Sequence, residues 1–154
     1  MKINPVYFIL SFLIFITYSN SFDIPFHFDD SHTVHANLAI RDFWGRFFDF
    51  FTDAKTYSYR PENSGYRPLS TLFVAVGYLL SQQNTWGYHF LKLVELCACS
   101  FLLFHITICL LSIFKPQNFS INTQHTIAFF TSALFVLHPA NTETVNYISA
   151  VTTL

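Results

Sequence analysis

Charged residues are scarce in this chain of 154 residues. Asp, Glu, Lys and Arg together make up 11% of it, against roughly 25% in an average soluble domain. A soluble domain of this size covers its surface with polar groups, and eight basic and nine acidic side chains are too few for that. Intrinsic disorder is excluded too, because 52% of the residues are hydrophobic and the net charge is only −1.

Glycine, proline and cysteine are also rare. Four glycines and six prolines exclude collagen-like and low-complexity sequence. The three cysteines, Cys97, Cys99 and Cys109, are an odd number inside one apolar stretch, so they make no disulfide framework. A chain of such low net charge lacks the basic footprint of a nucleic-acid-binding protein. What the chain has in abundance is phenylalanine, with 20 residues, and the composition favours a membrane protein.

Three long stretches carry no charged side chain. They cover residues 3–22, 96–114 and 116–142. About 20 apolar residues cross the roughly 30 Å hydrocarbon core of a bilayer as a helix. The pattern therefore predicts an all-α multi-pass membrane protein with three transmembrane helices, at about 3–22, 89–114 and 121–138.

Two of the uncharged stretches have alternative interpretations. The first could be a cleaved signal peptide, but Tyr18–Phe22 offers no Ala-x-Ala-like site, so we expect a retained anchor. A further stretch, residues 68–91, has an apolar part of only twelve residues, Leu69–Leu80. We expect an interfacial or re-entrant helix there, since a fourth crossing would invert everything after it.

The few lysines outside the long polar loop set the predicted orientation. Lys2 and Lys115 flank the predicted spans, so the N-terminus and residues 115–120 should lie in the cytoplasm. The loop 23–88 and the start of a second loop, 139–154, then share the opposite, luminal face. The glycosylation sequon at Asn118 would be cytoplasmic and stay unmodified.

Residues 36–53 show the period of an amphipathic helix. Asp42, Arg46, Asp49 and Asp53 repeat on one side, and the other side is aromatic, with Phe43, Trp44, Phe47, Phe48 and Phe51. Such a helix would lie in the headgroup plane or pack against the chain's own transmembrane helices. In either case it would run along the membrane within the luminal loop.

Adjacent carboxylates directly follow the first predicted span. Asp29 and Asp30 repel each other, and each raises the proton affinity of its neighbour, which suits a proton-accepting site. The alternative is a solvated loop start that caps the next helix. His32 and His35 lie one helical turn apart beside them and leave a metal site as an option, but two histidines alone are a weak signal and no metal is predicted.

A second cluster follows the third predicted span. Pro139 would end or kink that helix, which would leave His138 and Glu143 at the membrane interface. Taken alone, this cluster is better explained by a helix end with an interfacial Tyr, Tyr147.

In their order along the chain these elements resemble the N-terminal part of the membrane O-mannosyltransferases that carry tetratricopeptide repeats. These belong to the polyprenyl-phosphate-sugar-dependent, GT-C-like glycosyltransferases. The matching residues span positions 28 to 147: Phe28, Asp29, Asp30, Asn37, Tyr66, Arg67, Pro68, Leu69, Gly87, Tyr88, His89, His138, Pro139, Thr142, Glu143 and Val145.

The resemblance implies sugar transfer to Ser or Thr hydroxyls of an acceptor protein. The donor would be a lipid-linked sugar phosphate, mannose on dolichyl phosphate, with no further cofactor. Asp29 or Asp30 would be the catalytic base, Arg67 would hold the donor phosphate, and Glu143 with His138 would form the second luminal-loop motif. The location would be the endoplasmic reticulum membrane, or the inner membrane in a bacterium.

The chain departs from the family pattern in three positions and in length. Asn141 stands where a second His is common, Val151 where an Arg often follows, and Lys92 in place of an Asn. The family continues into further transmembrane helices and helical repeats after the position of Leu154. We therefore expect a fragment too short to act alone. The alternative is a non-enzymatic membrane protein or an inactive remnant.

Overall fold

The computed structural model describes residues 5–114 and 119–152, and in these residues the chain is all-helical. The α-helices are α1 (Pro5–Thr17), α2 (Phe43–Arg46), α3 (Asp49–Thr52), α4 (Pro68–Ser81), α5 (Trp86–Phe114), α6 (Ile121–Val136) and α7 (Asn141–Asn146). Single turns of 3₁₀ or π helix lie between them: η1 (Ser19–Asp23), η2 (Ser31–His35), η3 (Ala39–Arg41), η4 (Ala54–Thr56), η5 (Pro61–Asn63) and η6 (Ile148–Thr152). The predicted all-α class is confirmed. Lys2, Lys115 and the sequon residue Asn118 lie outside the described residues.

One described helix, α5, is long and apolar enough to cross a membrane. It has 29 residues, and its most apolar window of 18 residues has a mean hydropathy of 2.3. Only 17% of that window is buried, whereas the core helix of a soluble protein would be mostly buried. Helix α1 has 13 residues and α6 has 16, both shorter than the roughly 20 residues of a crossing, so the other two spans stay predictions.

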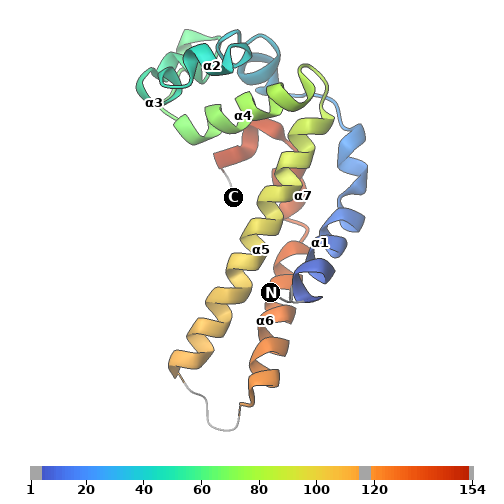
Figure 1. Cartoon of the computed structure of the whole chain (residues 1–154). Coiled ribbons are helices and arrows are strands. Elements are labelled where there is room, and N and C mark those ends of the chain that lie inside the picture. The colour runs from blue at the N-terminus through green and yellow to red at the C-terminus, as the bar shows by residue number, and fades with distance from the viewer. Residues whose placement is uncertain (1–4, 115–118, 153–154) are drawn as a thin grey trace. The chain divides into compact units, whose positions relative to one another are not determined.

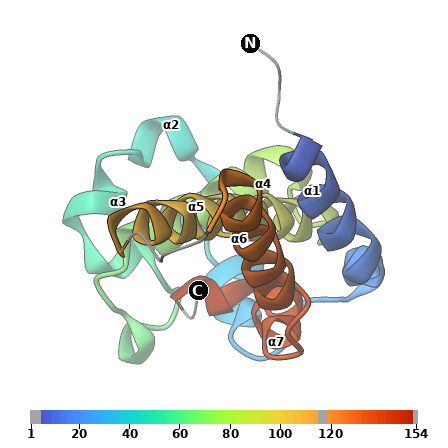
Figure 2. The ribbon, with the colours of Figure 1, turned by 90° about the horizontal axis from the view of Figure 1, so that it is seen from below.

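The chain divides into two compact units. Unit 1 comprises residues 1–19 and 93–141, and unit 2 comprises residues 20–92 and 142–154. In unit 1, α1 packs against α6, and the Tyr18 hydroxyl donates to the carbonyl oxygen of Val136 at 2.8 Å. The Tyr7 hydroxyl lies 2.7 Å from Nε2 of His105 on α5, so the three helices lie side by side (Figure 1, Figure 2).

In unit 2, the single amphipathic helix predicted for residues 36–53 is wrong. The segment forms three short pieces, η3, α2 and α3. Asp42 has a non-helical backbone (φ −107°, ψ 71°), and its side chain accepts a hydrogen bond from the Gly45 N–H, which caps α2. Local capping thus outweighs the helical period. The aromatic side is divided as a result, because Phe43 is buried whereas Trp44 is 81% exposed.

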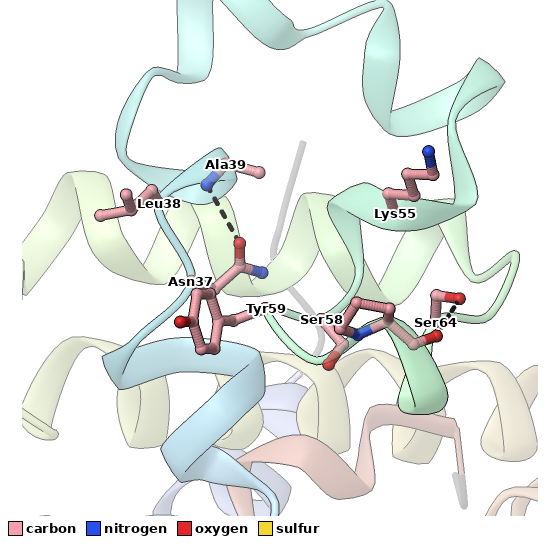
Figure 3. Close-up of a pocket in the computed structure, with 8 residues that line it drawn as sticks. Asn37, Leu38, Ala39, Lys55, Ser58, Tyr59 and Ser64 are labelled. Carbon is pink, nitrogen blue, oxygen red and sulfur yellow. Dashed lines mark hydrogen bonds between the residues drawn. The ribbon is translucent and has the colours of Figure 1, made fainter.

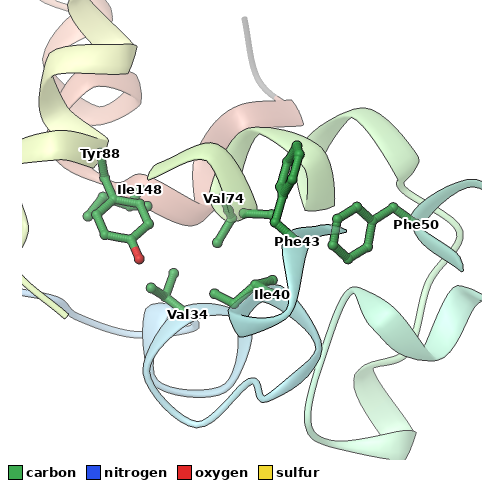
Figure 4. Packing of buried hydrophobic residues seen from close by; sticks show 8 residues of the cluster. Val34, Ile40, Phe43, Phe50, Val74, Tyr88 and Ile148 are labelled. Carbon is green, nitrogen blue, oxygen red and sulfur yellow. The ribbon is translucent and has the colours of Figure 1, made fainter. Parts of the chain in front are cut away.

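The core of unit 2 forms around α4, which confirms a helix near the expected Leu69–Leu80. Pro68 starts this helix, in the position where its missing N–H costs nothing. Its inner face packs against η2, η3, α2, α3 and η6. Figure 4 shows the apolar cluster that results, which comprises Val34, Ile40, Phe43, Phe50, Val74, Ala75, Tyr88 and Ile148.

Residues distant in sequence are also tied together by His89. Its two ring nitrogens lie 3.2 Å from the carbonyl oxygens of Ile24 and Val145. His89 is fully buried, so these contacts hold the segment before Asp29 close to α7. Asp29, Asp30 and Glu143 therefore all belong to unit 2.

Candidate functional site

The acidic pair follows a backbone turn that few residues adopt. Phe28 has a φ of 50°, a left-handed backbone conformation that is unfavourable for residues other than glycine. The π-helical turn η2 begins two residues after Asp29. Irregular backbone of this kind is frequent at functional sites. In this turn the two neighbouring aspartates have different surroundings.

Asp30 is fully buried and fully bonded. Its Oδ1 accepts hydrogen bonds from the backbone N–H of Ser149 at 2.8 Å and from the Ser149 hydroxyl at 2.5 Å. Its Oδ2 accepts from the backbone N–H of His27 at 3.1 Å. Asp30 therefore ties η6 to the turn before η2.

Asp29, in contrast, has a side chain that is 62% exposed. It lines a cavity of about 290 Å³, here called the Asp29 pocket, whose other walls are His32, Tyr57, Asn63 and Arg67. Of the two predicted bases, Asp29 is thus the one that a substrate can reach.

His32 is held rigidly beside Asp29. Its Nε2 lies 3.3 Å from Oδ1 of Asp29, and its side chain is only 6% exposed. Nδ1 lies 3.0 Å from the Ser58 hydroxyl, and Nε2 lies 3.1 Å from the amide nitrogen of Asn63. Contacts on both ring nitrogens fix the ring, so His32 limits the positions that the Asp29 carboxylate can take.

Arg67 supplies the positive charge of the Asp29 pocket. Its Nη1 donates to the Tyr57 hydroxyl at 3.0 Å, and its guanidinium lies over the Tyr57 ring, 5.0 Å from the centroid. A guanidinium has five N–H donors, so one bond to Tyr57 leaves donors for a phosphate. The pocket therefore combines an exposed carboxylate with a cation.

Asn37 holds Tyr57 in place from inside unit 2. This buried side chain donates to the carbonyl oxygens of Thr33 at 3.1 Å and Thr56 at 2.9 Å. Its own oxygen accepts from the backbone N–H of Ala39 at 3.0 Å (Figure 3). Asn37 thus connects η2, which carries His32, to the segment that carries Tyr57.

Asn37 also lines a second cavity. It has a volume of about 370 Å³ and is drawn in Figure 3. Its lining residues are Asn37, Leu38, Ala39, Lys55, Ser58, Tyr59, Pro61 and Ser64. This cavity is larger than the Asp29 pocket. It is less suited to proton transfer, because its lining includes no carboxylate and no histidine.

Glu143 lines a third cavity of about 340 Å³, here called the Tyr147 pocket. Tyr147 connects this pocket to the acidic pair, because its hydroxyl oxygen accepts a hydrogen bond from the backbone N–H of Asp29 at 3.3 Å. Burial, together with the carboxylates of Asp29 and Asp30, raises the pKa of Tyr147 to about 12, so the phenol stays protonated at neutral pH.

His138 belongs to unit 1. It is exposed after the end of α6, where its Nδ1 accepts from the backbone N–H of Ala140 at 3.2 Å. Helix α6 ends at Val136, two residues before the position predicted, because the residue before a proline avoids the helical conformation.

Sequence reasoning missed Tyr57, Asn63 and Tyr147 as residues of these pockets. All three reach Asp29 only through tertiary contacts, and no periodic pattern marks them. From the sequence, His32 is a candidate metal ligand only. In residues 5–114 and 119–152, no group of three or more His, Cys, Asp or Glu side chains is arranged to hold a metal ion.

Comparison with known proteins gives three curated relatives, although no family model and no solved structure matches the chain. Protein O-mannosyl-transferase Tmtc3 of Drosophila melanogaster is 29% identical over 84% of this chain. Protein O-mannosyl-transferase F38B6.6 of Caenorhabditis elegans is 28% identical over 92%, and Protein O-mannosyl-transferase Tmtc1 of Drosophila melanogaster is 27% identical over 88%.

The similarity covers 15% of the length of the two Drosophila proteins and 20% of that of the C. elegans protein. The resemblance indicated by residues 28–147 is therefore confirmed: over most of its length, the chain is distantly similar to the N-terminal parts of TMTC protein O-mannosyltransferases.

Proposed function

We propose that this chain supplies the base-bearing site of a membrane protein O-mannosyltransferase. The donor is mannose on a polyprenyl or dolichyl phosphate, and the acceptor is a Ser or Thr hydroxyl of a protein. The observation that carries the proposal is that an exposed carboxylate, Asp29, and an arginine, Arg67, line one pocket. The similarity to protein O-mannosyltransferases supports the same reaction.

Asp29 acts as the general base of a single displacement. The hydroxyl of the acceptor passes its proton to the Asp29 carboxylate while its oxygen bonds to the anomeric carbon of the sugar. The bond between that carbon and the phosphate oxygen breaks, and the lipid phosphate leaves with the electron pair. One carboxylate is enough for this inverting reaction, because the phosphate leaves as an anion and no acid has to protonate it.

Arg67 holds the phosphate of the donor. A guanidinium binds phosphate oxygens through two parallel N–H donors, which fixes the direction of the leaving group. Its contact with Tyr57 restrains the side chain before the donor arrives. This ordering lowers the entropy cost of binding a lipid substrate.

Asp30 serves the fold in this proposal. Its oxygens already accept three hydrogen bonds from Ser149 and His27, and a carboxylate so occupied has little room for a substrate hydroxyl. The burial of Asp30 therefore supports Asp29 as the base.

A lipid donor requires the site to lie at a membrane. Helix α5 supports one crossing, and we propose two more over residues 3–22 and 121–138. Residues 23–88 and the segment after residue 138 then face the lumen of the endoplasmic reticulum, or the periplasm in a bacterium.

Transfer of radiolabelled mannose from dolichyl phosphate to a Thr-containing peptide tests the base. In lipid nanodiscs that hold a full-length transferase containing these residues, Asp29→Asn should lower the transfer rate about a hundred- to ten-thousandfold and leave thermal unfolding unchanged. The matched control is Asp49→Asn, which alters an exposed aspartate on α3 that lines none of the three pockets. Transfer by Asp29→Asn at the wild-type rate would exclude this residue as the base.

Binding of dolichyl phosphate tests the donor site without requiring turnover. Arg67→Gln should weaken this binding about tenfold, since charge-assisted hydrogen bonds to phosphate are lost. Arg46→Gln, at an exposed arginine on α2, is the control and should bind as the wild type does. Equal binding by the two variants would contradict the assignment of Arg67.

A further inference from the structure

The Tyr147 pocket has a construction that the transfer of a sugar from a lipid does not explain. It is lined by His27, Phe28, Thr142, Glu143, Asn146 and Tyr147. The rings of His27 and Tyr147 are stacked, with centroids 6.2 Å apart, and Phe28 meets Tyr147 edge-on at 5.9 Å. Phe28 is nevertheless 81% exposed, on a left-handed backbone. An exposed aromatic side chain in a strained position points to a binding surface.

This pocket contacts the backbone of the proposed base through Tyr147. The Tyr147 hydroxyl accepts the backbone hydrogen bond of Asp29, and the Asp29 side chain lines the neighbouring pocket together with Arg67. In a single displacement the attacking hydroxyl approaches from the side opposite the leaving phosphate, with the base beside it. A pocket connected to Asp29 but without Arg67 is therefore where the acceptor can lie.

We propose that the Tyr147 pocket binds the acceptor segment of the protein substrate, and that Glu143 selects segments with a lysine or arginine next to the target Ser or Thr. The inference rests on the proposed function, because it takes Asp29 as the base and Arg67 as the phosphate ligand.

The charge of the pocket supports a basic neighbour. Glu143 is exposed and is the only carboxylate among the lining residues, which include no lysine or arginine. Tyr147 stays neutral because burial raises its pKa to about 12. A cationic side chain beside the acceptor hydroxyl would thus meet one uncompensated negative charge.

Asn146 provides a contact for the backbone of the acceptor segment. Its side-chain oxygen accepts from the Ser21 hydroxyl at 2.7 Å, and the other end of the amide is its NH₂ group. That group is a donor of the kind that binds a peptide carbonyl. The exposed face of Phe28 adds an apolar surface for the rest of the segment.

The test compares two labelled peptides that differ only beside the target Thr, one with Lys and one with Gln. Their binding to the full chain in nanodiscs is measured by fluorescence anisotropy. We expect the wild type to bind the Lys peptide about 1.5-fold to fivefold more tightly, the range of an exposed ion pair. Glu143→Gln should remove that preference, and Phe28→Ala should weaken the binding of both peptides.

Two controls separate the acceptor pocket from the proposed function. Glu62→Gln removes another exposed glutamate of unit 2 that lines none of the three pockets, and it should keep the preference for Lys. Dolichyl phosphate should bind Glu143→Gln and the wild type equally. A Lys preference that survives Glu143→Gln, or is absent from the wild type, would overturn this inference. Donor binding that is insensitive to Arg67→Gln would instead contradict the proposed function alone.

Discussion

Unit 1 and unit 2 differ in the side chains that their interiors bury. In unit 1 many large apolar residues are more than half exposed: Phe8, Phe12, Ile16, Leu102, Ile106, Ile113, Phe130 and Leu134. The same unit buries small residues such as Ser100, Ala128 and Ser132. In unit 2 an apolar cluster around Phe50 and Val74 is buried, and the polar pockets open at the surface.

This difference supports the proposal that unit 1 lies in lipid and unit 2 in water. Apolar side chains that face outward and small residues at helix contacts are typical of helices in lipid. An apolar core beneath a polar surface is typical of a domain in water. A titratable base needs access to water and substrate, and Asp29 accordingly lies in unit 2.

The largest expected effect tests the core of unit 2. Phe50 is 1% exposed, so Phe50→Ala should lower the free energy of unfolding by about 4 kcal/mol through lost contacts and the cavity left behind. Trp44→Ala, at a side chain that is 81% exposed, should change it by less than about 0.5 kcal/mol. Urea titration in mild detergent measures both, and equal effects would contradict a buried core at Phe50.

The next effect tests whether the exposed apolar surface of unit 1 faces lipid. Leu102 is 62% exposed on α5, and a charge in the middle of a spanning helix costs about 3 kcal/mol. When membranes are extracted at alkaline pH, Leu102→Asp should therefore move much of the chain from the membrane pellet to the soluble extract. Leu38→Asp changes a similarly exposed leucine of unit 2 and should leave the distribution unchanged. If both variants extract alike, the two units do not differ in solvent.

The smallest effect tests close packing inside unit 2. A Cβ on Gly77 would clash with the ring of Tyr88, so Gly77→Ala should destabilise the protein by about 2 kcal/mol. A Cβ on Gly65 would come no closer than 3.8 Å, to Nε of Arg67, so Gly65→Ala should be neutral or stabilise by about 0.5 kcal/mol. Thermal unfolding followed by circular dichroism distinguishes the two. A Gly77→Ala protein as stable as the wild type would show that α4 and Tyr88 are less closely packed.

Long helices could be predicted well because their signal is repeated along many residues. Residues 89–114 were expected as a helix and α5 covers Trp86–Phe114, and the helix expected at 121–138 is α6 at Ile121–Val136. The segment 36–53 has a helical period too, but the Asp42 side chain accepts a hydrogen bond from the Gly45 N–H, and this cap separates α2 from η3. A short segment is decided by a few local contacts, which a period does not reveal.

The sequence by itself determined the helical class, the apolar segment that can span a membrane, and the order of motifs from Phe28 to Val145. These follow from composition and spacing, which are properties of the chain before it folds. Only the tertiary structure distinguished Asp29 from Asp30, since two neighbours in sequence are chemically alike until Ser149 bonds one of them. The same holds for Tyr57 and Tyr147, because contacts between residues far apart in the chain exist only after folding.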